Sequence, residues 1–183
     1  MKKIIKSLTL LLTVAVLFSS CLKSETIIGP DSPGSVGAII EFDNPEFIAA
    51  SSGSVAVPLS RYEFLTLKTG NKVHIDVQYS GTGKPAPSDI SVGITTDPTA
   101  LTAHLSTAQA NKPTFVPLPA GLVTLPTAVT IPSGQIKAGF DITITDQFVA
   151  NTTYAVALKI ASASAGTISG NFGTIVVALK RVP

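Results

Sequence analysis

The chain has 183 residues, of which 45% are hydrophobic and 13% charged, and its formal net charge is +2. This length accommodates one domain with a sizeable core and is too short for two ordinary domains with a linker. Fourteen glycines and thirteen prolines favour many short strands joined by turns. Because no basic run follows position 21, the composition argues against nucleic acid as a partner.

Residues 1–20 are predicted to be an export signal. Lys2, Lys3 and Lys6 form a positive start. The apolar run 8–18 (LTLLLTVAVLF) is shorter than the ~20 residues that a membrane-spanning helix needs. Removal of this segment leaves ten basic and eleven acidic residues, so the mature chain carries a net charge of −1.

The single cysteine, Cys21, follows this segment directly. The sequence Phe18-Ser19-Ser20-Cys21 resembles the lipobox of bacterial lipoproteins, in which the cysteine is diacylated and becomes the new N-terminus. The resemblance implies a membrane anchor of several acyl chains, since a single chain binds only marginally. The alternative is an ordinary secretory signal in which Cys21 is merely a small residue. A cysteine used for lipid leaves the exported domain without a disulfide.

Residues 21–37 are predicted to form a lipidated, flexible tether, because they are rich in glycine, proline, serine and charge. Lys23-Ser24-Glu25 is a short version of the acidic stretch that directs Bacteroidetes lipoproteins to the cell surface. We therefore expect attachment to the cell outer membrane, and the sequence leaves open whether the domain faces the periplasm or the cell surface.

Residues 38–183 are predicted to form one all-β domain. The clearest strand is 72–79 (KVHIDVQY), in which apolar and polar residues alternate, and 139–145 and 154–160 repeat this pattern. Weaker strand patterns cover 38–42, 54–59, 63–67, 90–95, 128–131 and 172–180. About nine strands without a convincing helix predict a two-sheet β-sandwich.

Two segments between the strands have their own patterns. Residues 97–109 could form a turn or two of helix, capped by Asp97 or Thr99. Residues 111–121 carry three prolines and are predicted to be an extended crossing between the sheets.

The residues with chemical potential are few. The two histidines are His74, on the outer face of a predicted strand, and His104, in the short helical segment. The chain contains no G-x-S-x-G, H-E-x-x-H, P-loop or G-x-G-x-x-G motif. We therefore predict a protein that is not an enzyme and needs no cofactor.

One acidic stretch could bind a metal ion. Glu41, Asp43, Asn44 and Glu46 could supply several oxygens to calcium. Because no spaced aspartate loop is present, a solvated turn that ends the strand is the preferred interpretation, and calcium binding is left open.

Tyr62 and Phe64, near a predicted turn at 60–63, are the candidate glycan contacts, because the chain has no tryptophan and three tyrosines. Glycan binding predicts that both rings are exposed together on one rim. The competing interpretation is a cluster at the edge of the core.

Several stretches resemble a domain of unknown function, family 1735, which lies at the N-terminus of many Bacteroidetes surface lipoproteins. They are 77–81 (VQYSG), 88–90 (SDI), 129–134 (VTIPSG), 153–160 (TYAVALKI) and 168–171 (ISGN). The resemblance spans about residues 38 to 180 and implies an immunoglobulin-like sandwich without catalytic residues, used as a spacer or adhesion module.

From these observations we expect a non-enzymatic, lipid-anchored envelope protein that binds a protein or matrix partner through loops or a sheet edge. The alternative is a small glycan-binding lipoprotein of a polysaccharide-utilisation system.

Overall fold

The computed structural model describes residues 37–43, 60–106 and 114–183. All of them belong to the compact unit Val36–Pro183, whereas the unit Met1–Ser35 lies outside the described residues. The predicted export signal, Cys21, Asn44, Glu46 and the predicted strand at 54–59 also lie outside them. No helix among the described residues is long and apolar enough to cross a membrane.

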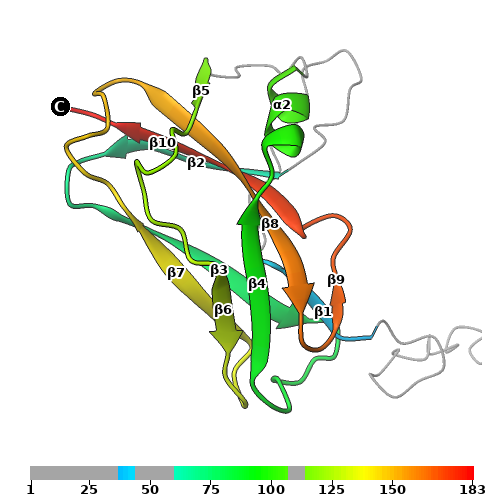
Figure 1. The fold of residues 1–183 in the computed structure, drawn as a ribbon. Helices are drawn as coiled ribbons and strands as arrows, with labels where there is room; N and C mark the ends of the chain where they lie inside the picture. The colour runs from blue at the N-terminus through cyan, green and yellow to red at the C-terminus, as the bar shows by residue number, and fades with distance from the viewer. Residues whose placement is uncertain (1–36, 44–59, 107–113) are drawn as a thin grey trace, which may run out of the picture. The chain divides into compact units, whose positions relative to one another are not determined.

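Two antiparallel-rich sheets make up the domain (Figure 1). The four-stranded sheet has the order β7 (Lys137–Thr143), β3 (Lys72–Ser80), β1 (Ile39–Phe42) and β9 (Thr167–Ile168). The six-stranded sheet contains β2 (Ser60–Leu67), β10 (Thr174–Arg181), β8 (Thr153–Ala163), β4 (Ile90–Thr96) and β6 (Ala128–Ile131), with β5 (Phe115–Pro117) also paired with β8. This arrangement confirms the predicted all-β, immunoglobulin-like sandwich.

The main core lies between the two sheets and follows the alternation of the sequence. On β3, Val73, Ile75 and Val77 are buried, while His74 between them is exposed. Strands of the opposite sheet contribute Ile175, Val177 and other apolar side chains to the same cluster. Burial of these apolar faces against each other is the main stabilising contribution to the fold.

The outer face of the six-stranded sheet is covered by the helix α2 (Pro98–Ser106). This helix continues from the end of β4 (Figure 1). Asp97 caps it, because its Oδ1 accepts a hydrogen bond from the Ala100 amide at 2.9 Å. Leu101 packs against Ala155, Ala157 and Val176 in a second, smaller core. The helix predicted within 97–109 and its cap at Asp97 are therefore confirmed.

Other local expectations need correction. Residues 60–63, predicted as a turn, form the beginning of β2 instead. The alternation of the strand 154–160 predicts one buried face, whereas Ala155 and Ala157 are also buried because α2 covers them. The short strands β5 and β9 have no counterpart in the sequence prediction, because two or three residues are too few to show a period.

Candidate functional site

A split in the six-stranded sheet creates an apolar hollow. The antiparallel strand β4 pairs with β8 as far as Thr96 opposite Leu158. The parallel strand β5 pairs with the same edge of β8 as far as Pro117 opposite Ala155. The two strands therefore approach this edge from opposite ends, and between them Val156 has no ladder partner on that side.

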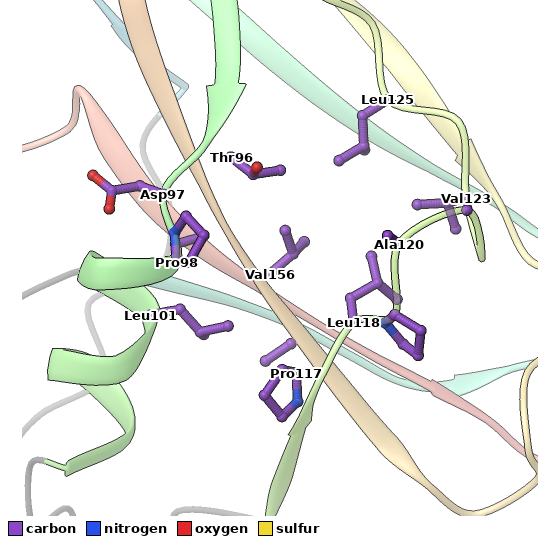
Figure 2. A pocket seen from close by; sticks show the side chains of 14 residues that line it. Thr96, Asp97, Pro98, Leu101, Pro117, Leu118, Ala120, Val123, Leu125 and Val156 are labelled. Atoms are coloured by element: carbon purple, nitrogen blue, oxygen red, sulfur yellow. The ribbon is translucent and has the colours of Figure 1, made fainter.

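The hollow in this split, which we call the slot, has a volume of about 390 Å³ (Figure 2). One wall comes from the end of β4 and the start of α2, with Thr96, Pro98 and Leu101. The segment 117–125 forms the opposite wall, and β8 crosses the floor at 155–157. Figure 2 shows the side chains of Leu101 and Val156 pointing into the slot.

The slot joins the two cores of the molecule. Val123, Leu125 and Val156 pack with the main core between the sheets. Leu101 and Ala157 belong to the smaller core under α2. Apolar side chains of both cores thus line one hollow, and the lining is mainly apolar.

Two backbone carbonyls at the floor of the slot and the carboxylate at its wall already have partners. The carbonyl oxygen of Ala155 accepts a hydrogen bond from the Leu118 amide at 2.8 Å, and that of Ala157 accepts one from the Asp97 amide at 3.0 Å. The Asp97 carboxylate caps α2, lies 3.7 Å from the Lys159 ammonium and points away from the slot in Figure 2. The floor therefore offers few polar contacts to a ligand.

A buried arginine lies beside the slot, under α2. The Arg61 side chain is 1% exposed and forms an ion pair with Glu63, with 2.6 Å between Nη2 and Oε1. Its Nη1 donates to His104 Nε2 at 3.3 Å, and its Cζ lies 5.0 Å from the centre of the Phe115 ring. Because guanidinium only donates, His104 Nε2 acts as the acceptor in this contact. These contacts attach α2 and β5 to the sheet.

The second histidine belongs to a charged network on the outer face of the four-stranded sheet. His74 Nδ1 lies 2.7 Å from Asp141 Oδ1, and its Nε2 lies 3.0 Å from Asp76 Oδ1. The hydrogen bond to Asp141 is the largest cause that raises the pKa of His74; desolvation opposes it and Asp76 adds to it. Both ring nitrogens can donate only in the imidazolium form, which two carboxylates stabilise.

The carboxylates of this network have lowered pKa values. The hydrogen bond from His74, and then that from Lys72, lowers the pKa of Asp141. Partial burial works to raise the pKa of Asp76, but Lys137 and then His74 outweigh it. Lys137 also contacts Asp43, so opposite charges alternate across this face.

The structure does not expose the predicted glycan contacts on a rim. Tyr62 and Phe64 are half-buried and pack against the main core, with their ring centres 6.2 Å apart. Burial, followed by the Asp43 and Asp76 carboxylates, raises the pKa of the Tyr62 hydroxyl. These two rings thus match the edge-of-core interpretation, and glycan contact stays a prediction.

The described acidic residues of the proposed calcium stretch are bound within the protein. Glu41 Oε1 accepts hydrogen bonds from Gln78 and Ser80, and Asp43 pairs with Lys137. In the part of the chain that the structure describes, no three histidine, cysteine or acidic side chains are grouped to hold a metal ion.

Sequence reasoning missed the slot, because no motif marks it. Its local signals are small residues at 155 and 157 within a strand and prolines at 117 and 119. Pairing of β4 and β5 with one edge of β8 is a tertiary feature that neither pattern reveals.

Comparisons with known proteins identify the domain. Two solved structures from Bacteroides ovatus share the fold, and each is 17% identical over 78% of this chain. One is a protein of unknown function, with a TM-score of 0.56; the other is a multidomain protein including DUF1735, with a TM-score of 0.52. The chain spans 46% and 44% of their lengths. No curated protein matches the sequence.

The model of a family described as an N-terminal domain matches residues 42–167, which is most of the described unit. The matched range includes the strands of both sheets from the end of β1 to the start of β9, together with α2 and both walls of the slot. The chain therefore belongs to this family of N-terminal domains, and its fold neighbour that includes DUF1735 is consistent with the resemblance to family 1735.

Proposed function

We propose that the chain is a non-enzymatic, lipid-anchored protein of the cell envelope whose β-sandwich binds a protein partner. The fold and the family support one part of this proposal, namely that the chain is a modular domain. The solved neighbours contain a similar domain within chains about twice as long. The export signal and Cys21 supply the argument for the envelope.

The placement of the histidines carries the argument against an enzyme. His104 is buried and accepts a hydrogen bond from Arg61, whereas His74 lies between two carboxylates on an open sheet face. Neither histidine lines the slot, and the slot is mainly apolar. General acid–base chemistry needs a titratable group within hydrogen-bond reach of a substrate in a pocket. The described hollows are lined by no histidine. Their two carboxylates are engaged, Asp97 with Lys159 and Asp141 with Lys72 and His74.

The anchoring part of the proposal is tested by Cys21→Ser. The native chain should fractionate with the outer membrane and incorporate labelled palmitate, and the variant should lose the label. Ser20→Ala, which keeps the cysteine, is the matched control. Labelling of the Cys21→Ser variant would contradict the lipid assignment.

The binding part is tested by photo-crosslinking in the intact cell envelope. Val116, Ile136 and Val149 are exposed apolar residues at separate places, so each can be replaced by p-benzoylphenylalanine with little effect on the core. We expect one of these positions to give a specific adduct whose protein component, once purified, binds the purified chain saturably. If none of the three gives an adduct that excess unlabelled chain competes away, the partner-binding function is wrong.

A further inference from the structure

The slot is an unusual feature for a sandwich because it opens through a sheet rather than beside it. Its floor at 155–157 is reached only because β4 and β5 stop short of each other along β8. The small side chains of Ala155 and Ala157 leave space above the floor. Ala120 and Gly121 likewise add little volume to the opposite wall. The result is a hollow of about 390 Å³ within the size range of ~300–1,000 Å³ that ligand pockets occupy.

The chemistry of the lining selects an uncharged ligand. The Ala155 and Ala157 carbonyls are bonded to the Leu118 and Asp97 amides, so they offer little to a peptide main chain. A peptide backbone that entered the slot would lose hydrogen bonds to water without replacing them, which is costly. The Asp97 carboxylate, the charged group nearest the slot, points away from it and is engaged with α2 and Lys159. A hydrocarbon group makes no hydrogen bonds to water, so it loses none when it enters the slot.

We propose that the slot binds the hydrocarbon part of an uncharged small molecule, an alkyl chain or ring that contacts Leu101, Val123 and Val156. This site goes beyond the partner-binding function and does not depend on it. On binding, the apolar walls exchange contact with water for contact with the ligand. The favourable binding free energy grows with the apolar area removed from water.

Straight-chain alcohols are the probes that test the proposal. The full chain carrying Cys21→Ser is titrated with 1-butanol, 1-pentanol and 1-hexanol, and binding is followed by amide chemical shifts. The shifts should saturate and concentrate at 96–101, 117–125 and 155–157. Each added methylene should tighten binding roughly fourfold, the ratio that corresponds to ~0.8 kcal/mol per buried methylene.

Two variants place the site within the slot. Val123→Thr keeps the shape of a half-buried wall residue but adds a hydroxyl, and it should weaken hexanol binding by at least about fivefold. Ala120→Phe adds bulk to an exposed wall position and should weaken binding without disturbing the core, so it serves if the first variant unfolds. Thr124→Val changes the next residue, which lines the adjoining polar hollow but not the slot, and should leave hexanol binding unchanged.

The outcomes separate this site from the proposed function. Saturable binding that follows chain length and is lost in the slot variants supports the site even when crosslinking finds no partner. Shifts spread over the whole domain, affinities that do not change with chain length, or equal effects of Val123→Thr and Thr124→Val would overturn it. Slot amides that respond to a protein partner but to none of the alcohols would overturn it as well.

Discussion

At the residue scale, Gly139 shows how one missing side chain makes the charged network possible. It lies opposite Asp76 on β3, and a Cβ there would meet the Ile75 carbonyl oxygen, His74 Nε2 at 2.6 Å and Asp76 Oδ1 at 2.7 Å. Because the first of these atoms is backbone, the crowding cannot be relieved by a side-chain rotation alone. Gly139→Ala should lower the free energy of unfolding by about 1–3 kcal/mol in urea titrations.

Gly170 is the matched control for this substitution. A Cβ at Gly170 has no atom within 4 Å, so Gly170→Ala should change the free energy of unfolding by no more than about 0.5 kcal/mol. Equal losses of unfolding free energy at the two glycines would show that β3 has room for a side chain at position 139.

His74 gives the molecule a pH-dependent contact. Its raised folded-state pKa means that its stabilising contribution is complete below the unfolded value of about 6.5 and is lost as the pH rises through the folded value. Because His74 is largely exposed, the change in stability should stay below ~1 kcal/mol.

The histidine titration itself is the sharper measurement. An NMR titration of the ring should give a pKa above 6.5, and Asp141→Asn should lower it, because the hydrogen bond to Asp141 is its largest cause. Lys84→Ala, a change outside this network, should leave the midpoint where it is. A His74 midpoint at or below the ordinary value in the native chain would contradict the contact.

Tyr62 and Phe64 illustrate what residue identity alone could not decide. The sequence analysis named them together as candidate glycan contacts, and their ring centres are 6.2 Å apart. The prediction placed them beside a turn, however, because residues 60–63 lack the alternation of apolar and polar residues that marks a strand. Their half-burial follows from the pairing of β2 with β10, a contact between segments more than a hundred residues apart.

At the element scale, α2 depends on its cap. Asp97→Ala removes the acceptor for the Ala100 amide and should cost about 1 kcal/mol of stability in thermal or urea unfolding. Asp97→Asn keeps a capping oxygen and should stay within a few tenths of a kcal/mol of the parent. If both variants lose the same stability, the carboxylate charge and its contact with Lys159 matter more than the cap.

The attachment of α2 to the sheet depends on Arg61. Arg61→Ala removes a buried ion pair with Glu63, the contact with His104 and the packing on Phe115. We expect a loss of about 2–4 kcal/mol, with faster hydrogen exchange in α2 than in β3. Lys159→Ala removes a half-exposed cation from β8 and should cost less than about 0.5 kcal/mol. Unchanged exchange in α2 would show that apolar packing alone holds the helix.

The elements differ in how far the sequence could predict them. Strands with one buried face, such as the first six residues of β3, follow their alternation. On β8 the first six residues are all buried, since one face meets the main core and the other meets α2, and alternation fails as a guide there. The slot could not be predicted for the same reason: it depends on where two paired strands stop, and only the assembled sheet determines that position.

At the scale of the whole molecule, β10 is the strand that completes the six-stranded sheet. It pairs in parallel with β2 and antiparallel with β8, and it contributes buried residues to both cores. Removal of residues 174–183 should therefore abolish the folded state, seen as loss of dispersed amide resonances. Removal of the exposed Pro183 alone should leave the spectrum intact. A folded domain without β10 would mean that β2 and β8 can find other partners.

The pairing of β2 with β10 also determines when the six-stranded sheet can form during translation. During translation, β2 emerges more than a hundred residues before its partner, and the six-stranded sheet stays incomplete until 174–181 have left the ribosome. Long-range strand pairing is slow to form, so the nascent polypeptide remains open through most of its synthesis. An open polypeptide is the form that can be threaded through a narrow translocation channel, so the late closure of this sheet suits the export that we propose.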